Sequence, residues 1–181
     1  MDLQTPLDRE AIRACLERDA RLDTLLDDAN IRACLTRFSR GMDRFDKALY
    51  ISAYHPDAKI AAGQFATHHN LLDCTIDLAG EVAHAETYSL FVGRNRDDSN
   101  WIAGGRYLDR LERRDGAQGL EWKIALRTNL IEWSGMASSL PLPFADLPDI
   151  FDNGAPSRSP ADPSYQRPLT NHRAPHDPSA G

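Results

Sequence analysis

Hydrophobic positions in the first fifty residues repeat with the period of an α-helix. Residues 6–20 and a second segment from about Thr24 each carry an apolar stripe, and Asp8 is suited to cap the first helix. The letters IRACL occur at both 12–16 and 31–35, but the residues around them differ. We therefore expect two helices with similar apolar faces, not an internal duplication.

After residue 58 the pattern changes to the alternation of β-strands. Pro56 ends the helical part, and a first strand is expected to begin near Ala58. Short polar turns, including Ala79-Gly80 and Asp115-Gly116, then separate long alternating segments. Four such segments are expected, at 68–78, 81–94, 101–114 and 121–134. The order predicts an α+β fold in which helices at the front of the chain pack on one face of a curved, mainly antiparallel sheet.

The last part of the chain has a different composition. Nine of the eleven prolines lie after residue 135, so we expect an arm that is partly extended or disordered. The apolar stretch 140–151 could lie along the domain or along a neighbouring subunit. His172 and His176 are four residues apart, but Pro175 between them argues against a helical metal pair. We expect no metal site.

Charge and cysteine content narrow the possible partners. The net charge of −6 gives no general attraction to nucleic acid. No apolar run approaches the length of a membrane span, and the polar, acidic start does not resemble a secretory signal. Three widely spaced cysteines indicate reduced thiols. We expect a cytoplasmic protein that binds neither nucleic acid nor membranes.

Four stretches together resemble the SnoaL-like branch of the nuclear transport factor 2-like superfamily. They are GMDRFDKALYISAYHPDA, THHNLLDCTIDLAGEVAHAETY, GGRYLDRLERRDG and EWKIALRTNLIEWS. The resemblance covers about residues 25–135. It implies a cone-like fold in which the N-terminal helices pack on the sheet around a pocket. It also divides the chain into an N-terminal helical extension (1–23), a SnoaL-like domain (24–135) and the Pro-rich arm (136–181).

The same resemblance implies a set of catalytic residues. Dehydrochlorinase members of the superfamily pair an Asp at a helix end with a His early in the next strand, and an Arg on the last strand completes the site. Asp43, His69 and Arg127 match these positions. An imidazole can take and return a proton near neutrality, a carboxylate on one ring nitrogen fixes its tautomer, and a guanidinium can stabilise developing negative charge.

Other interpretations of these residues stay open at this point. His68 could face inward in place of His69, since neighbours in a strand point to opposite faces. Arg127 could be a cross-strand partner of Asp109 or Glu112. Asp43 could simply belong to a turn. Further residues are expected to contact a substrate: Asp73, Tyr88, Trp101 and Tyr107.

These residues predict a cofactor-independent lyase or isomerase that acts on a hydrophobic cyclic, polyketide-like or steroid-like molecule. A non-catalytic binding or assembly module of the same fold is the alternative, and an accessory subunit of a ring-hydroxylating dioxygenase is a third. A homodimer or homotrimer is expected. Between residue 58 and His69 the chain is too short for a helix that members of the family usually have there. Either the site is more open than in those relatives, or a segment is missing from this sequence.

Overall fold

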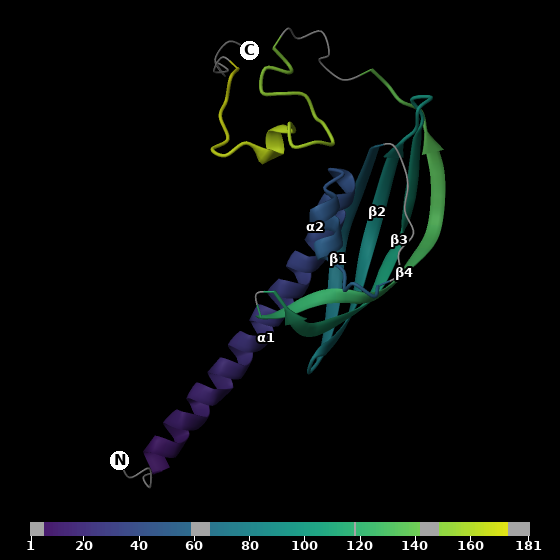
Figure 1. The fold of residues 1–181 in the computed structure, drawn as a ribbon. Helices are drawn as coiled ribbons and strands as arrows, with labels where there is room; N and C mark the ends of the chain where they lie inside the picture. The colour runs from purple at the N-terminus through teal and green to yellow at the C-terminus, as the bar shows by residue number, and fades with distance from the viewer. Residues whose placement is uncertain (1–5, 59–65, 118, 142–148, 174–181) are drawn as a thin grey trace, which may run out of the picture.

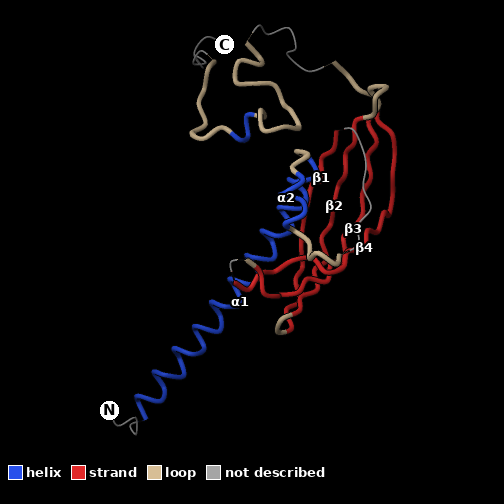
Figure 2. Tube along the Cα trace, in the orientation of Figure 1, coloured by secondary structure: helices blue, strands red, loops and turns tan. Residues whose placement is uncertain are grey.

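The computed structural model describes residues 6–58, 66–117, 119–141 and 149–173. Two helices come first, four strands follow, and a single turn of 3-10 helix lies near the end (Figures 1 and 2). The elements are α1 (Pro6–Asp43), α2 (Lys47–Ser52), β1 (Ala66–Ala79), β2 (Val82–Arg94), β3 (Asn100–Gly116), β4 (Gly119–Ala137) and η1 (Pro163–Tyr165).

The strands form one antiparallel meander in the order β1-β2-β3-β4, and the sheet is open. The chain reverses after Ala79, as expected, but Asp115 and Gly116 are the last residues of β3, so the expected turn there lies further along the chain, between Gly116 and Gly119. Gly80 and Gly119 adopt positive φ angles of 63° and 108° at the two tight turns, a conformation that glycine takes without steric cost. The end of α1 and all of α2 lie on the concave side of the curved sheet (Figure 1). The predicted α+β class is therefore confirmed.

The first helix is longer than expected. The break that we placed before Thr24 is absent, because α1 continues through residues 21–23 for a total of 38 residues. Those three residues are Arg, Leu and Asp, and none of them interrupts a helix as Gly or Pro would. The N-terminal half extends away from the sheet (Figure 1), with Ile12 and Leu16 exposed. The two segments with similar apolar faces therefore belong to one continuous helix, and the prediction of two separate helices was wrong.

The core lies between the second half of α1 and the concave face of the sheet. A helical stripe of α1 is fully or almost fully buried there: Ile31, Cys34, Leu35 and Phe38. The opposing side chains include Ala83, Ala85, Tyr107, Leu111, Trp122 and Ile124. This packing fixes the direction in which α1 ends, and Asp43 is its last residue.

Residues after α1 turn sharply back onto it. Asp46 caps α2 by accepting a hydrogen bond from the backbone N–H of Leu49 at 2.9 Å. Gly41 permits the close approach of the two helices, because a Cβ there would lie 2.5 Å from the backbone nitrogen of Tyr50. Beyond α2, Tyr54 forms a single parallel bridge to Ile124 of β4. The strand expected near Ala58 would fall at 59–65, outside the described residues.

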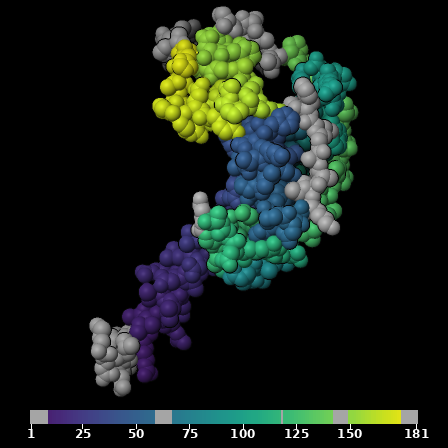
Figure 3. All heavy atoms as spheres, viewed as in Figure 1, coloured from purple at the N-terminus to yellow at the C-terminus, as the bar shows by residue number. Residues whose placement is uncertain are grey.

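Over its described residues, 149–173, the C-terminal arm has no strand and one short 3-10 turn, η1. Residues 149–173 return to the C-terminal end of α1 (Figure 3), where Arg44 pairs with the buried Asp162 at 3.5 Å. Arg40 stacks on the Tyr165 ring, 4.9 Å from its centroid. Most of the apolar stretch 140–151 lies outside the described residues. Among the described helices, none is long and apolar enough to cross a membrane.

Candidate active site

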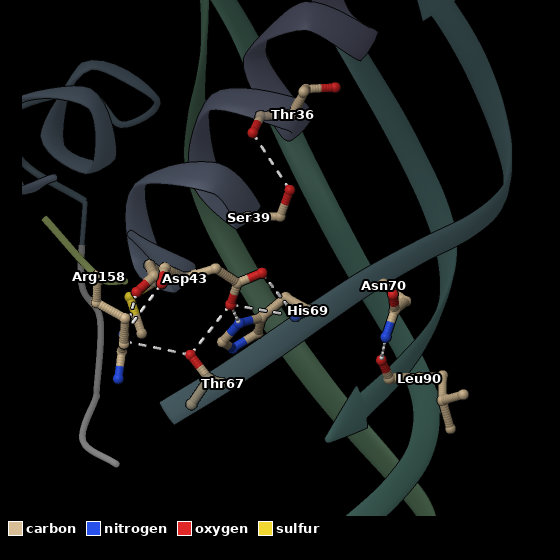
Figure 4. Close-up of polar contacts among 9 residues, drawn as sticks. Thr36, Ser39, Asp43, Thr67, His69, Asn70, Leu90 and Arg158 are labelled. Carbon is tan, nitrogen blue, oxygen red and sulfur yellow. Dashed lines mark hydrogen bonds and ion pairs between the residues drawn. The ribbon is translucent and has the colours of Figure 1, made fainter. Parts of the chain in front are cut away.

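The end of α1 meets the start of β1 through a pair of polar side chains. Asp43 Oδ1 lies 2.7 Å from His69 Nδ1, and the His69 backbone N–H donates to Asp43 Oδ2 at 2.9 Å. The Thr67 hydroxyl donates to Asp43 Oδ1 at 3.0 Å. Figure 4 shows the three side chains converging. The carboxylate therefore accepts hydrogen bonds from the Thr67 hydroxyl and the His69 backbone N–H, and it contacts the His69 ring, all within one strand.

This position is electrostatically costly for a carboxylate. The C-terminal end of a helix carries partial negative charge from its unpaired carbonyls, which disfavours an acidic residue there. Thr67 and His69 offset this cost with the Thr67 hydroxyl, the His69 backbone N–H and the contact of the His69 ring. The local fold thus stabilises a charge that the helix alone would repel.

The imidazole of His69 lies among aromatic rings. Its centroid is 5.6 Å from that of Phe38 and 5.0 Å from that of Phe91, both in edge-on contacts. Phe91 in turn contacts Trp101. The His69 side chain is 8% exposed. Within the described part of the chain no group hydrogen-bonds to Nε2, so the ring keeps one nitrogen available while Asp43 holds the other.

Arg127 lies on β4 and forms a buried ion pair. Its Nε and Nη2 donate to the two carboxylate oxygens of Asp109, each at 2.7 Å, and the two side chains are 8% and 0% exposed. The guanidinium also stacks on Phe38 and Tyr107. Burial acts to lower the pKa of Arg127, but the hydrogen bonds and the charge of Asp109 outweigh it and raise the pKa overall. Arg127 is fully charged.

One guanidinium nitrogen of Arg127 is left over. Nη1 is buried and has no hydrogen-bond partner among the described residues. An unpaired buried donor costs free energy, so such a group is suited to receive an acceptor from a bound molecule. Since Phe38 contacts both the Arg127 guanidinium and the His69 ring, the two groups lie on the same side of the sheet.

Two of the four residues expected to contact substrate lie on this side. Tyr107 is buried against Phe38 and Arg127, and burial raises the pKa of its phenol, which is therefore neutral near pH 7. Trp101 is half-buried and reaches the site through Phe91. Both side chains extend the apolar surroundings of the Asp43–His69 pair.

The other two expected residues face elsewhere. Tyr88 is 49% exposed and packs near Arg106, whereas its neighbour Thr87 is buried, so Tyr88 lies on the outer face of the sheet. Asp73 is exposed because the β1–β2 register shifts between Leu71 and Cys74. This bulge moves the inward position from residue 73 to Cys74, which simple alternation from His69 cannot anticipate.

The structure also separates the alternatives for the two matched residues. His68 is exposed, and His69 is the histidine that meets Asp43. Arg127 pairs with Asp109, while Glu112 binds Arg110 and Arg114 instead. Arg127 is therefore the cross-strand partner of Asp109, and its Nη1 takes no part in that ion pair.

Two residues at the pair were missed in the sequence. Thr67 lies two positions before His69, on the same face of β1, and this spacing could have identified it. Arg158 comes from the C-terminal arm and donates to Thr67 Oγ1 at 3.3 Å (Figure 4). Nothing in its Pro- and Ser-rich surroundings indicates a contact with residues more than ninety positions earlier.

The protein is of the α+β class: an open antiparallel sheet carries helices on its concave face. A carboxylate–imidazole pair lies where α1 meets β1. The family model described as the SnoaL-like domain matches residues 59–128. This match agrees with the SnoaL-like resemblance found in the sequence. His69 and Arg127 fall inside the matched stretch, and Asp43 precedes it.

Solved structures share the fold. The hexachlorocyclohexane dehydrochlorinase LinA type 2 has a TM-score of 0.60 at 15% identity, over 70% of this chain and 99% of that one. LinA type 3 from Novosphingobium barchaimii LL02 has a TM-score of 0.58 at 14% identity, over 68% and 98%. A candidate scytalone dehydratase from Novosphingobium aromaticivorans DSM 12444 has a TM-score of 0.54 at 16% identity, over 66% and 97%. Identities this low establish likeness of fold alone. No curated protein matches the chain.

Proposed function

We propose that this protein is a cofactor-independent lyase or isomerase acting on a hydrophobic cyclic, polyketide-like or steroid-like molecule. The observation that carries the proposal is the 2.7 Å contact between Asp43 Oδ1 and His69 Nδ1. It holds the imidazole in the tautomer that leaves Nε2 unprotonated, as a general base requires. The dehydrochlorinase and candidate dehydratase among the fold neighbours support the same reaction class by analogy.

The proposed reaction begins with proton abstraction. Nε2 of His69 takes a proton from a carbon next to an activating group, and Asp43 stabilises the imidazolium that forms. The electron pair of the broken C–H bond becomes a new carbon–carbon double bond. In an elimination, the leaving group departs with its bonding electrons; in an isomerisation, the imidazolium returns the proton to another carbon.

Arg127 is proposed to stabilise the negative charge that develops. Two of its nitrogens are held by Asp109, so Nη1 is the group that would donate to an enolate oxygen or a departing atom. The Asp109 carboxylate balances the positive charge of the guanidinium, so the ion pair as a whole is close to neutral. Arg127 would therefore act as a fixed hydrogen-bond donor in a buried site, and its contribution would come from preorganisation.

The proposed substrate class follows from the surroundings of His69. Phe38, Phe91, Trp101 and Tyr107 present aromatic surface around few polar groups. Apolar walls with a small number of placed polar groups are typical of sites for hydrophobic small molecules. A cyclic molecule with a single carbonyl or halogen would place its one polar atom near Arg127.

A non-catalytic binding module is the second candidate. The observation that favours it is the burial of the pair, since only 8% of the His69 side chain is accessible. In that case Asp43 and His69 would hold the end of α1 on β1 as a structural contact.

Turnover of a substrate panel distinguishes the two. Halogenated cyclohexanes, hydroxylated polyketide-like ketones and unsaturated steroid ketones would be incubated with the full chain, and products followed by mass spectrometry and by absorbance of the new double bond. His69→Gln should abolish turnover, whereas the matched control His68→Gln, which alters an exposed neighbour, should retain it. Ligand binding without turnover, unaffected by His69→Gln, would favour the binding module.

A further inference from the structure

Arg158, in the C-terminal arm, contacts the backbone that carries Asp43. Its Nη2 donates to the carbonyl oxygen of Met42 at 2.7 Å, and its Nε donates to the carbonyl oxygen of Asp43 at 3.0 Å. These carbonyls belong to the last turn of α1, where a helix has no N–H donors four residues on to pair with them. The Met42 oxygen also accepts a long hydrogen bond, 3.4 Å, from the Phe45 N–H. A single guanidinium thus caps the helix end at the residue that binds His69.

The same guanidinium sets the direction of a hydroxyl proton. Nη2 of Arg158 lies 3.3 Å from Thr67 Oγ1, and Thr67 Oγ1 lies 3.0 Å from Asp43 Oδ1. Arginine can only donate hydrogen bonds, so Thr67 accepts from Arg158 and its own proton points to Asp43. Figure 4 shows this sequence of contacts from Arg158 through Thr67 to Asp43 and His69.

The arm holds Arg158 in place through contacts of its own. Asp162 accepts a hydrogen bond from the Ser157 backbone N–H at 2.8 Å and pairs with Arg44, which itself donates to the Ser157 carbonyl. The Arg158 guanidinium also lies over the Phe45 ring, 3.2 Å from its centroid. These contacts surround Arg158 on both sides in sequence, so its position follows from docking of the arm and not from a lone surface contact.

We propose that Arg158 is a positioning residue for the Asp43–His69 pair, and that residues 149–173 are therefore part of the site. The proposal rests on the proposed function in that this pair is the reacting unit. Arg158 acts through Asp43 and Thr67: it fixes the last turn of α1 and keeps the carboxylate within hydrogen-bond distance of Nδ1. A lysine could not replace it fully, because one ammonium cannot reproduce the planar fork that contacts three oxygens.

The test is the protection of the His69 Nδ1 proton from exchange with water, measured by proton NMR on the full chain. In the wild type this proton is held by Asp43, and its signal should persist. Arg158→Gln should make the signal exchange much faster, and Arg158→Lys should give an intermediate rate. The matched control is Arg173→Gln, which removes another arginine of the arm; Arg173 pairs with Asp149, and among the described residues it has no hydrogen bond or ion pair with α1. It should behave as the wild type.

Asp43→Asn is the reference for complete loss of the pair. If Asp43→Asn abolishes protection and Arg158→Gln leaves it intact, the positioning role is wrong while the proposed function stands. If Asp43→Asn also leaves the signal unchanged, the pair itself fails, and the proposed function with it. Circular dichroism of each variant verifies folding, and a misfolded Arg158→Gln would shift the decision to Arg158→Lys, whose protection must then fall below that of the control for the proposal to hold.

Discussion

Asp43 and His69 are 26 residues apart in the chain, yet the carboxylate of one lies 2.7 Å from the ring of the other. The first is the last residue of α1, and the second lies near the start of β1. Their contact therefore depends on how the end of α1 packs on the sheet. A substitution that shifts the end of α1 by a fraction of an ångström should therefore disturb the contact between Asp43 and His69.

The substitution Gly41→Ala is expected to shift the C-terminal end of α1. In an isolated helix alanine is favoured over glycine by ~1 kcal/mol. Here the added Cβ would lie 2.5 Å from the Tyr50 nitrogen and 2.7 Å from its Cα, which must move. Overpacking of this kind costs about 1–3 kcal/mol. Urea unfolding should show a net loss of stability, and any turnover should fall as well.

Gly135→Ala is the matched control for this substitution. Gly135 is an exposed residue of β4, and its Cβ would meet no atom within 4 Å. Its unfolding midpoint should stay close to that of the wild type. A Gly41→Ala variant as stable as this control would mean that α1 and α2 are not in close contact.

Much of this fold could be predicted because its signals are local. Alternation of apolar and polar residues identified all four strands, and Gly at the tight turns marked where they reverse. The core stripe Ile31, Cys34, Leu35 and Phe38 has helical spacing in the sequence. The resemblance, together with strand alternation, was enough to propose Asp43 opposite His69. The catalytic roles of the two residues stay a prediction.

The features that could not be predicted depend on contacts between distant segments. A bulge between Leu71 and Cys74 exposes Asp73. The position of this bulge depends on the pairing of β1 with β2 and cannot be deduced from the sequence of β1 alone. Arg158 reaches the site only because Asp162 and Arg44 dock the arm on α1. Proline content predicts that the arm builds no core of its own. It gave no sign of an arm docked on another element.

Removal of Asp109 should be strongly destabilising. Asp109→Ala leaves the buried Arg127 guanidinium without the carboxylate that binds Nε and Nη2. Breaking a buried ion pair from one side costs about 3–5 kcal/mol, because the remaining charge stays buried and unpaired. The free energy of unfolding should fall by this order. Replacing both partners, as Asp109→Leu with Arg127→Met, should recover much of the loss.

Glu132→Ala is the comparison for the buried pair. Glu132 binds Arg106 at 2.6 Å, but both side chains are partly exposed to solvent. Surface pairs contribute little, so its effect should be far smaller. Equal effects of Asp109→Ala and Glu132→Ala would contradict the assignment of Asp109 and Arg127 as a buried pair.

Acid should release the C-terminal arm. Hydrogen bonds from Ser157 and Ser164 lower the pKa of Asp162 from 3.8 to about 2. A carboxyl whose pKa is lower in the folded state stabilises that state fully above the unfolded pKa, and this contribution is lost as the pH falls through the folded pKa. Docking of the arm should thus weaken between about pH 4 and pH 2.

The Ser157 amide signal follows this transition, because that N–H donates to Asp162. Its NMR shift should change with a midpoint near pH 2 and should lack the transition in Asp162→Asn. A midpoint at the ordinary value of 3.8 would show that Asp162 accepts no hydrogen bonds in the folded state.

Two of the three cysteines, Cys15 and Cys34, should differ sharply in their rates of alkylation. Cys15 is exposed on α1, whereas Cys34 is fully buried and its thiol lies 3.2 Å from the Ala53 carbonyl oxygen. Burial raises the pKa of Cys34, which lowers the share of reactive thiolate. Iodoacetamide with mass spectrometry should label Cys15 first and Cys34 only after denaturation. Rapid labelling of Cys34 in the native protein would contradict the packing of α1 against the sheet.

The tautomer of His69 decides whether Asp43 orients the proposed base. Nitrogen-15 NMR of the full chain at neutral pH distinguishes a ring protonated on Nδ1 from one protonated on Nε2. We predict the Nδ1-protonated form in the wild type, its loss in Asp43→Asn, and its retention in Asp73→Asn, which alters an exposed carboxylate of the same strand. An Nε2-protonated ring in the wild type, or a tautomer unchanged by Asp43→Asn, would contradict the pair as an acid–base unit.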